Sequence, residues 1–145
     1  MNQAINMSYE SASSALSTGG DTNFCAPLAM AQVLHVNPLD LNDEVMKKGL
    51  RRFRGGMSTY NMERYLESKG ADLEVIFDKM KQWDASWGTM STIERKLPKG
   101  HYLVYIRRHV AALINGEVKD WTQGRRHQIT RIVKVEHNNQ PRVAP

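Results

Sequence analysis

The dipeptide Asn115-Gly116 is the feature of this sequence that most constrains its fold. Asn-Gly between two apolar stretches is the strongest short-range signal for a two-residue β-hairpin turn. Counting outward from this turn pairs Ala111 with Asp120 and His109 with Thr122. His109 and Asp120 then lie on the same face as diagonal neighbours, about 7–8 Å apart. A register shift of one residue would separate them, so the turn itself predicts an imidazole–carboxylate pair.

Cys25 is the only cysteine in the 145 residues, and it lies where a loop runs into an apolar helix. The free N–H groups and the positive dipole end of a helix N-terminus favour a thiolate over a thiol. With His109 and Asp120, Cys25 completes a set of nucleophile, base and orienting carboxylate. The simpler alternatives are a small buried cysteine and an ordinary carboxylate at a strand end. We expect the catalytic role, because only His109 among the five histidines has a carboxylate on its own face.

Attack by Cys25 on a carbonyl would create an oxyanion, which needs two hydrogen-bond donors. The backbone N–H of Cys25 is the first expected donor. The second is either the side chain of Asn23 or a backbone N–H in the loop 20–23. Trp121 is expected either to cover the end of the hairpin and keep water off the His–Asp contact, or to be plain core.

A single cysteine excludes an internal disulfide and any zinc site built from several thiolates. His109 and Asp120 have no obvious third ligand, so we expect neither a metal nor a cofactor. The chain is long enough for one domain with an ordinary core. No apolar run could span a membrane and no signal-peptide pattern opens the sequence, so we expect no membrane partner and an intracellular or virion location.

The formal net charge is +5, and seven arginines lie in three clusters that an acidic or virion partner could contact. The simpler interpretation is a solvated basic surface. No zinc-finger pattern, Walker loop or RNP-like aromatic motif accompanies these clusters, so sequence-specific binding of nucleic acid is not expected. The clustered arginines are Arg51, Arg52, Arg54, Arg107, Arg108, Arg125 and Arg126.

The order of the elements predicts an α+β fold, with N-terminal helices packed on a C-terminal antiparallel sheet or partial barrel. We expect helices at 25–35, at 41–48 with Asp40 as its cap, at 59–68 with Ser58 as its cap, and a short helix opened by the capping box Ser91-Thr92-Ile93-Glu94. Expected strands are 73–77, 102–106, the hairpin 109–114 and 117–121, and 129–135. Residues 1–20 are expected to form a loose arm or a short marginal helix, 21–137 the domain, and 138–145 a tail.

The order Cys25, His109, Asp120, together with the helix-then-sheet plan, resembles the papain-like cysteine peptidase superfamily. The segment Cys25-Ala26-Pro27-Leu28-Ala29-Met30 is similar to the catalytic helix of the double-glycine, bacteriocin-processing peptidases. Residues 100–121 resemble the C-terminal part of small papain-like proteins encoded by bacteriophages. The resemblance implies a papain-like fold acting on a peptide or protein substrate, in a bacterial cytoplasm or a virion.

One position departs from the papain-like pattern. Peptidases of this superfamily usually carry a glutamine about six residues before the nucleophile as an oxyanion donor, and here that position is Gly19. The resemblance therefore implies either that Asn23 substitutes or that the oxyanion hole is weaker. We expect a cysteine peptidase or amidase. The alternatives are a catalytically weak or inactive papain-like scaffold with a phage structural or host-interacting role, and acyl transfer.

Overall fold

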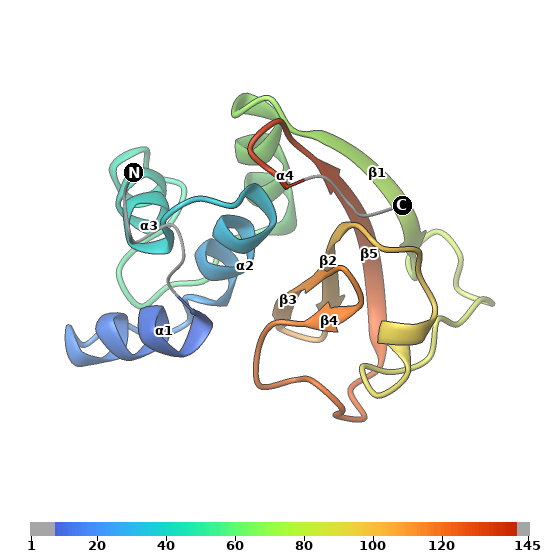
Figure 1. The fold of residues 1–145 in the computed structure, drawn as a ribbon. Coiled ribbons are helices and arrows are strands. Elements are labelled where there is room, and N and C mark those ends of the chain that lie inside the picture. The colour runs from blue at the N-terminus through green and yellow to red at the C-terminus, as the bar shows by residue number, and fades with distance from the viewer. Residues whose placement is uncertain (1–7, 142–145) are drawn as a thin grey trace.

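The computed structural model describes residues 8–141 and confirms the predicted α+β class (Figure 1). Within this range, the helices are α1 (Tyr9–Thr18), α2 (Cys25–Leu34), α3 (Pro38–Lys47), α4 (Thr59–Ser68) and a short 3₁₀ helix, η2 (Ile93–Arg95). The strands are β1 (Asp72–Asp78), β2 (His101–Ile106), β3 (His109–Ile114), β4 (Glu117–Val118) and β5 (Ile129–Glu136). They form one antiparallel sheet in the order β1-β5-β2-β3-β4. No helix among these residues combines the length and the apolar character needed to cross a membrane.

The sheet separates two hydrophobic clusters, and β2 contributes to both. Leu103 and Tyr105 belong to the cluster shared with the α-helices, whereas Tyr102, Val104 and Ile106 belong to a second cluster that includes η2. Every residue of β2 is buried. A strand covered on both faces needs apolar side chains at successive positions, which explains why this segment is continuously apolar rather than alternating.

Helix α2 lies between the sheet and the helices α1 and α3, and eight of its ten side chains are buried. Its N-cap residue is Phe24, which has no side-chain acceptor for the first backbone N–H groups. Helix N-termini are usually capped by Ser, Thr, Asp or Asn. The start of α2 therefore leaves donors available to a charge placed there, and Cys25 is the first helical residue.

The predicted start of the second expected helix was wrong. Helix α3 begins at Pro38 rather than Leu41, and its cap is Asn37, whose side chain accepts from the backbone N–H groups of Leu39 and Asp40. Asparagine followed by proline is the stronger start signal, because proline at the first helical position lacks only an N–H that would be unpaired there. The predicted Ser58 cap of α4 is confirmed.

The predicted capping box was also wrong. Thr92 forms no side-chain cap, and the helix lasts only three residues. The Glu94 carboxylate instead accepts from the backbone N–H of Val118 at 2.7 Å and from the Gln123 amide at 2.8 Å. The Glu94 carboxylate is thus bound by the hairpin side rather than by the start of its own helix, and this contact ties β4 to η2.

Of the two structures expected for the N-terminal segment, the described part adopts the helix. Ser8 caps α1 by accepting from the N–H of Ser11, and Ala12 is fully buried. The described part of the expected tail is tied to the domain, since the Gln140 side chain donates to main-chain carbonyls of α2 and β5. The rest of both segments, 1–7 and 142–145, lies outside the described residues.

The predicted Asn115-Gly116 turn is confirmed, with Ile114 paired to Glu117. However, β4 ends after two residues, and the last backbone bond of the hairpin joins the Lys119 N–H to the carbonyl of Ala112 at 2.9 Å.

The outer pairs predicted for this hairpin, Ala111 with Asp120 and His109 with Thr122, do not form. Asp120 instead accepts from the backbone N–H of Thr122 at 2.8 Å, which turns the chain away from the ladder. Aspartate favours this local turn because its side chain can bind the backbone two residues ahead.

Candidate active site

The structure brings Cys25, His109 and Asp120 together from three separate elements. His109 is the first residue of β3, and its Nε2 atom lies 2.6 Å from Oδ2 of Asp120. Both side chains are largely shielded from water, with 11 % of the His109 side chain and 2 % of that of Asp120 exposed. Because Nε2 faces the carboxylate, Nδ1 is the ring nitrogen left for Cys25, which lines the same cavity as His109.

The protonation of the cysteine and histidine is coupled. Burial raises the pKa of the Cys25 thiol, but the hydrogen bond with His109, the N–H of Val110, the imidazolium charge and the N–H of Ala26 outweigh it, so the pKa lies below its ordinary value. Burial lowers the pKa of His109, but its bonds and charge interactions with Asp120 and Cys25 raise it to about 9. The arrangement therefore favours the thiolate–imidazolium pair over the neutral thiol and imidazole.

Asp120 is held as a charged group. Burial raises the pKa of this carboxyl, but the bonds from His109 and Thr122 lower it below its ordinary value. Oδ1 accepts both the backbone N–H and the hydroxyl of Thr122, which leaves Oδ2 for His109. Sequence reasoning placed Thr122 opposite His109, and it missed this role in orienting the carboxylate.

Trp121 packs against the imidazole, with its ring centroid 5.0 Å from that of His109. The alternative in which Trp121 is plain core is wrong, because 52 % of the residue is exposed. The indole therefore covers one side of His109 while part of it meets solvent, and its ring centroid lies 5.6 Å from that of His127 in an edge-on arrangement.

A cavity of about 360 Å³ opens on the nucleophile side, and both Cys25 and His109 line it. Asn23, the predicted oxyanion donor, also lines this cavity and has a left-handed backbone, φ 57°. Its amide nitrogen donates to the carbonyl of Arg54 at 2.8 Å. One of its two amide hydrogens is thus committed to the loop, and the other remains for a ligand.

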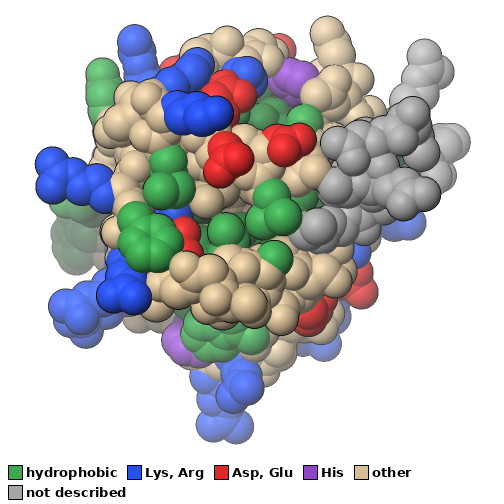
Figure 2. All heavy atoms as spheres, turned by 90° about the vertical axis from the view of Figure 1, so that its left-hand side faces the viewer, with side chains coloured by type: hydrophobic (Ala, Val, Ile, Leu, Met, Phe, Trp, Pro, Cys, Tyr) green, Lys and Arg blue, Asp and Glu red, His purple; other side chains and the backbone are tan. Residues whose placement is uncertain are grey.

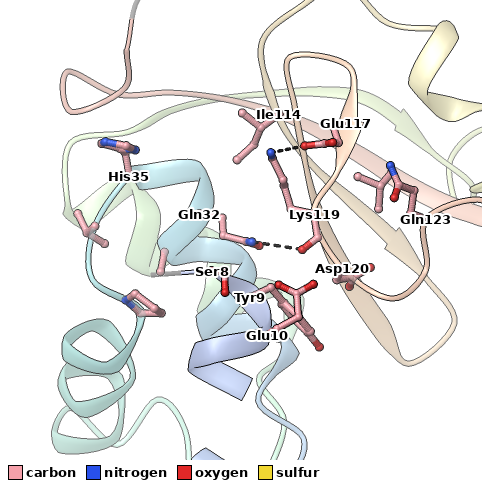
Figure 3. Close-up of a pocket in the computed structure, with 14 residues that line it drawn as sticks. Ser8, Tyr9, Glu10, Gln32, His35, Ile114, Glu117, Lys119, Asp120 and Gln123 are labelled. Carbon is pink, nitrogen blue, oxygen red and sulfur yellow. Dashed lines mark hydrogen bonds and ion pairs between the residues drawn. The ribbon is translucent and has the colours of Figure 1, made fainter. Parts of the chain in front are cut away.

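A second cavity, of about 440 Å³, lies on the other side of Asp120 (Figure 3). Tyr9 of α1 lines it together with Asp120. The pKa of Tyr9 is raised to about 12, first by burial and then by the negative charges of Asp120, Cys25 and Glu10, while a bond with Trp121 opposes the rise. Tyr9 therefore lies within electrostatic reach of the site. Sequence reasoning missed it, although Tyr9 is the single aromatic residue among the first twenty.

Arg51 is not available to a partner, so the expectation that all seven clustered arginines could contact one was wrong for this residue. Only 3 % of the residue is exposed. Its guanidinium donates to both carboxylate oxygens of Asp21, at 2.9 and 2.8 Å, and to the carbonyl of Thr22 at 2.7 Å. It also donates to Asn42 and Gly55, so it fixes the segment that leads into Cys25.

The other six clustered arginines are exposed, and they do not share one position in the fold. On the face drawn in Figure 2, Lys and Arg side chains are spread around the edge with acidic and hydrophobic side chains between them. That face offers no continuous basic patch, so charge alone identifies no partner surface on it.

The site carries no recognisable metal-binding set. Among residues 8–141, no group of three or more His, Cys, Asp or Glu side chains could hold a metal ion. Comparison of the chain with models of protein families, with curated proteins and with solved structures finds no match. The chemistry of this site must therefore be inferred from its geometry.

Proposed function

We propose that this protein is a cysteine peptidase or amidase of papain-like architecture, with Cys25 as nucleophile, His109 as acid and base, and Asp120 as the group that orients His109. One observation carries the proposal: a largely shielded imidazole is hydrogen-bonded to a carboxylate and shares a cavity with a thiol at a helix N-terminus, whose pKa it lowers. A structural cysteine needs none of these partners, whereas an activated nucleophile needs all of them.

The reaction follows from this arrangement. The Cys25 thiolate attacks the carbonyl carbon and forms a C–S bond, so that the carbonyl oxygen becomes an oxyanion. The His109 imidazolium then gives its Nδ1 proton to the amine as the C–N bond breaks and a thioester remains. Neutral His109 next takes a proton from water, the hydroxide attacks the thioester, and the thiolate leaves. Asp120 stabilises the imidazolium in both steps.

The oxyanion requires donors that are already in place. The uncapped backbone N–H of Cys25 is the first donor. The remaining amide hydrogen of Asn23, which lines the same cavity as Cys25, is the side-chain group placed to supply a second, and it would take the role of the glutamine that is absent before the nucleophile.

The first experiment is the rate of Cys25 alkylation by iodoacetamide as a function of pH. We expect fast alkylation near neutral pH in the native protein and loss of that advantage in His109→Ala. The variant His35→Asn, which changes an exposed histidine at the other end of α2, should behave like the native protein. A thiol that reacts only at high pH, or identically with and without His109, would contradict the proposal and favour a non-catalytic scaffold.

Hydrolysis and acyl transfer both pass through the thioester. They differ in the nucleophile that takes the acyl group from Cys25, which is water in hydrolysis and an amine in transfer. Mass spectrometry of products formed with and without an added amine measures the partition. We expect the free acid as the main product in the absence of amine.

A further inference from the structure

The cavity beside Cys25 has a distinct chemical character. Its lining includes Ala26, Met57, Met62, Ile106 and Val110, which are apolar. Among the described residues that line it, there is no Asp or Glu, and the ionisable groups are Cys25, Tyr105, Arg108 and His109, of which burial raises the pKa of Tyr105 and keeps it neutral. A volume of about 360 Å³ is within the range of small-ligand sites. The cavity therefore suits an apolar group with an anion near it, and it contains nothing that would repel an anion except the thiolate.

Arg108 has a backbone that is unusual for its residue type. It is the second residue of the two-residue turn between β2 and β3, next to the pair Ile106–His109, and its φ is 59°. Glycine and asparagine adopt this left-handed region most readily, and a long side chain there is uncommon. The other hairpin of this sheet follows the usual rule, since its turn is Asn115-Gly116.

Such an outlier beside a reactive group points to a role for its side chain rather than for its backbone. The arginine also has no partner of its own in the described part of the chain, where no carboxylate lies within ion-pair distance of Arg108. By contrast, Arg51 and Arg131 are paired with carboxylates. Arg108 is thus an exposed arginine without a carboxylate partner, and it lines the cavity that contains the nucleophile.

We propose that Arg108 is a specificity-determining residue that binds a carboxylate of the substrate. The substrate class is then a peptide with an apolar side chain in the cavity and a carboxylate close to the cleaved bond. That carboxylate belongs either to an Asp or Glu side chain or to a free C-terminus. The inference rests on the proposed peptidase function for its substrate, but the anion-binding property of the cavity does not depend on peptide cleavage.

The test compares two reagents of similar size on the same thiol, iodoacetate, which is an anion, and iodoacetamide, which is neutral. The quantity measured is the rate with iodoacetate divided by the rate with iodoacetamide. Any change in the thiol pKa affects both rates equally and cancels in this ratio. We expect Arg108→Gln to lower this ratio about threefold or more, because an attractive charge near the reacting atom is lost. At about 1 M salt the difference between the native protein and Arg108→Gln should shrink, because the charge is screened.

Arg107 supplies a matched control. It is the neighbouring residue of the same turn, carries the same charge and is exposed, yet it does not line the cavity. Arg107→Gln should leave the rate ratio nearly unchanged. Equal ratios in Arg107→Gln and Arg108→Gln, whether both fall or neither does, would overturn the proposal, because net charge or nothing at all would then explain the data.

Peptides identify the source of the carboxylate. Three fluorogenic peptides share an apolar residue. The first has an internal Glu and an amidated C-terminus, so its carboxylate is on a side chain. The second has Gln and an amidated C-terminus, so it has no carboxylate, and the third has Gln and a free C-terminus. We expect kcat/KM to favour one of the two acids, and that preference to be lost in Arg108→Gln but kept in Arg107→Gln. A preference that survives Arg108→Gln would overturn the assignment to Arg108. A rate ratio that depends on Arg108 without cleavage of any peptide would support the anion site and contradict the proposed peptidase.

Discussion

Oδ2 of Asp120 lies 2.6 Å from Nε2 of His109, while its other oxygen, Oδ1, is held by the backbone N–H and hydroxyl of Thr122. The carboxylate therefore has one fixed orientation and offers a single oxygen to the imidazole. This arrangement makes the charge on His109, and through it the charge on Cys25, depend on a residue that does not touch the thiol.

Asp120→Asn should change the pH range in which the Cys25 thiolate is stabilised by His109. The amide can still accept a hydrogen bond from His109, but it cannot stabilise the imidazolium charge, so the pKa of His109 should fall from about 9 toward its ordinary value. A weaker imidazolium stabilises the Cys25 thiolate less, so we expect the rise of the alkylation rate with pH to move toward higher pH, with the largest loss of rate near neutral pH. The measurement is the iodoacetamide rate against pH.

Thr122→Val is the matched control for the charge of Asp120. It removes one hydrogen bond to Oδ1 but leaves the carboxylate and the backbone bond in place. A shift in Thr122→Val as large as that in Asp120→Asn would show that orientation, rather than charge, sets the pKa of His109.

Asn23→Ala tests the source of the second oxyanion donor. The change removes the side-chain amide, and loss of one such donor lowers kcat by about a hundredfold in comparable sites. We expect a loss of that order in kcat with a small change in KM and an unchanged pH dependence of alkylation. Tyr9→Phe is the control, because Tyr9 lines the other cavity, and a large kcat loss there with none in Asn23→Ala would contradict the assignment to Asn23.

Arg51→Met should destabilise the fold. It leaves the buried carboxylate of Asp21 without its partner, and breaking a buried ion pair in this way costs about 3–5 kcal/mol. The measurement is the free energy of unfolding in urea near neutral pH. Arg52→Met, which changes the exposed neighbour, should alter that free energy by about 0.5 kcal/mol or less.

The contribution of the Asp21–Arg51 pair to the free energy of unfolding should depend on pH. The bond with Arg51 lowers the pKa of Asp21 below its ordinary value of 3.8 in the folded state, although burial opposes this effect. A lowered pKa contributes stability above the unfolded pKa, and this contribution is lost as the pH falls through the folded value. The difference in unfolding free energy between the native protein and Arg51→Met should therefore narrow from about pH 6 to pH 3. A constant difference would contradict this role for Asp21.

Local signals in the sequence predicted the elements that hold the site. Asn115-Gly116 fixed the inner register of the hairpin, and that register placed His109 and Asp120 on one side. The loop-to-helix transition at Cys25 likewise follows from a run of apolar helix formers. Each signal depends on residues close together in the chain, and the contact between His109 and Asp120 followed even though the outer ladder pairs did not form.

The missed features depend on contacts between distant segments. Nothing near Arg51 distinguishes it from its exposed neighbour Arg52, because its partner Asp21 is thirty residues away. Tyr9 lies in a Ser- and Ala-rich segment of weak periodicity, and its importance appears only once α1 packs beside the site. Glu94 met the pattern of a capping box, but the hairpin competed successfully for its carboxylate.

The uncapped start of α2 places stability and reactivity in opposition at one residue. An Asp or Ser in place of Phe24 would satisfy a free N–H group and strengthen the most buried helix of the domain. The same substitution would put a competing acceptor, and with Asp a second negative charge, beside the donors and the dipole end that stabilise the Cys25 thiolate. A cap at this position would therefore raise the stability of the helix at the expense of the reactivity of the thiol. For anyone engineering a more stable form, position 24 is the wrong place to begin.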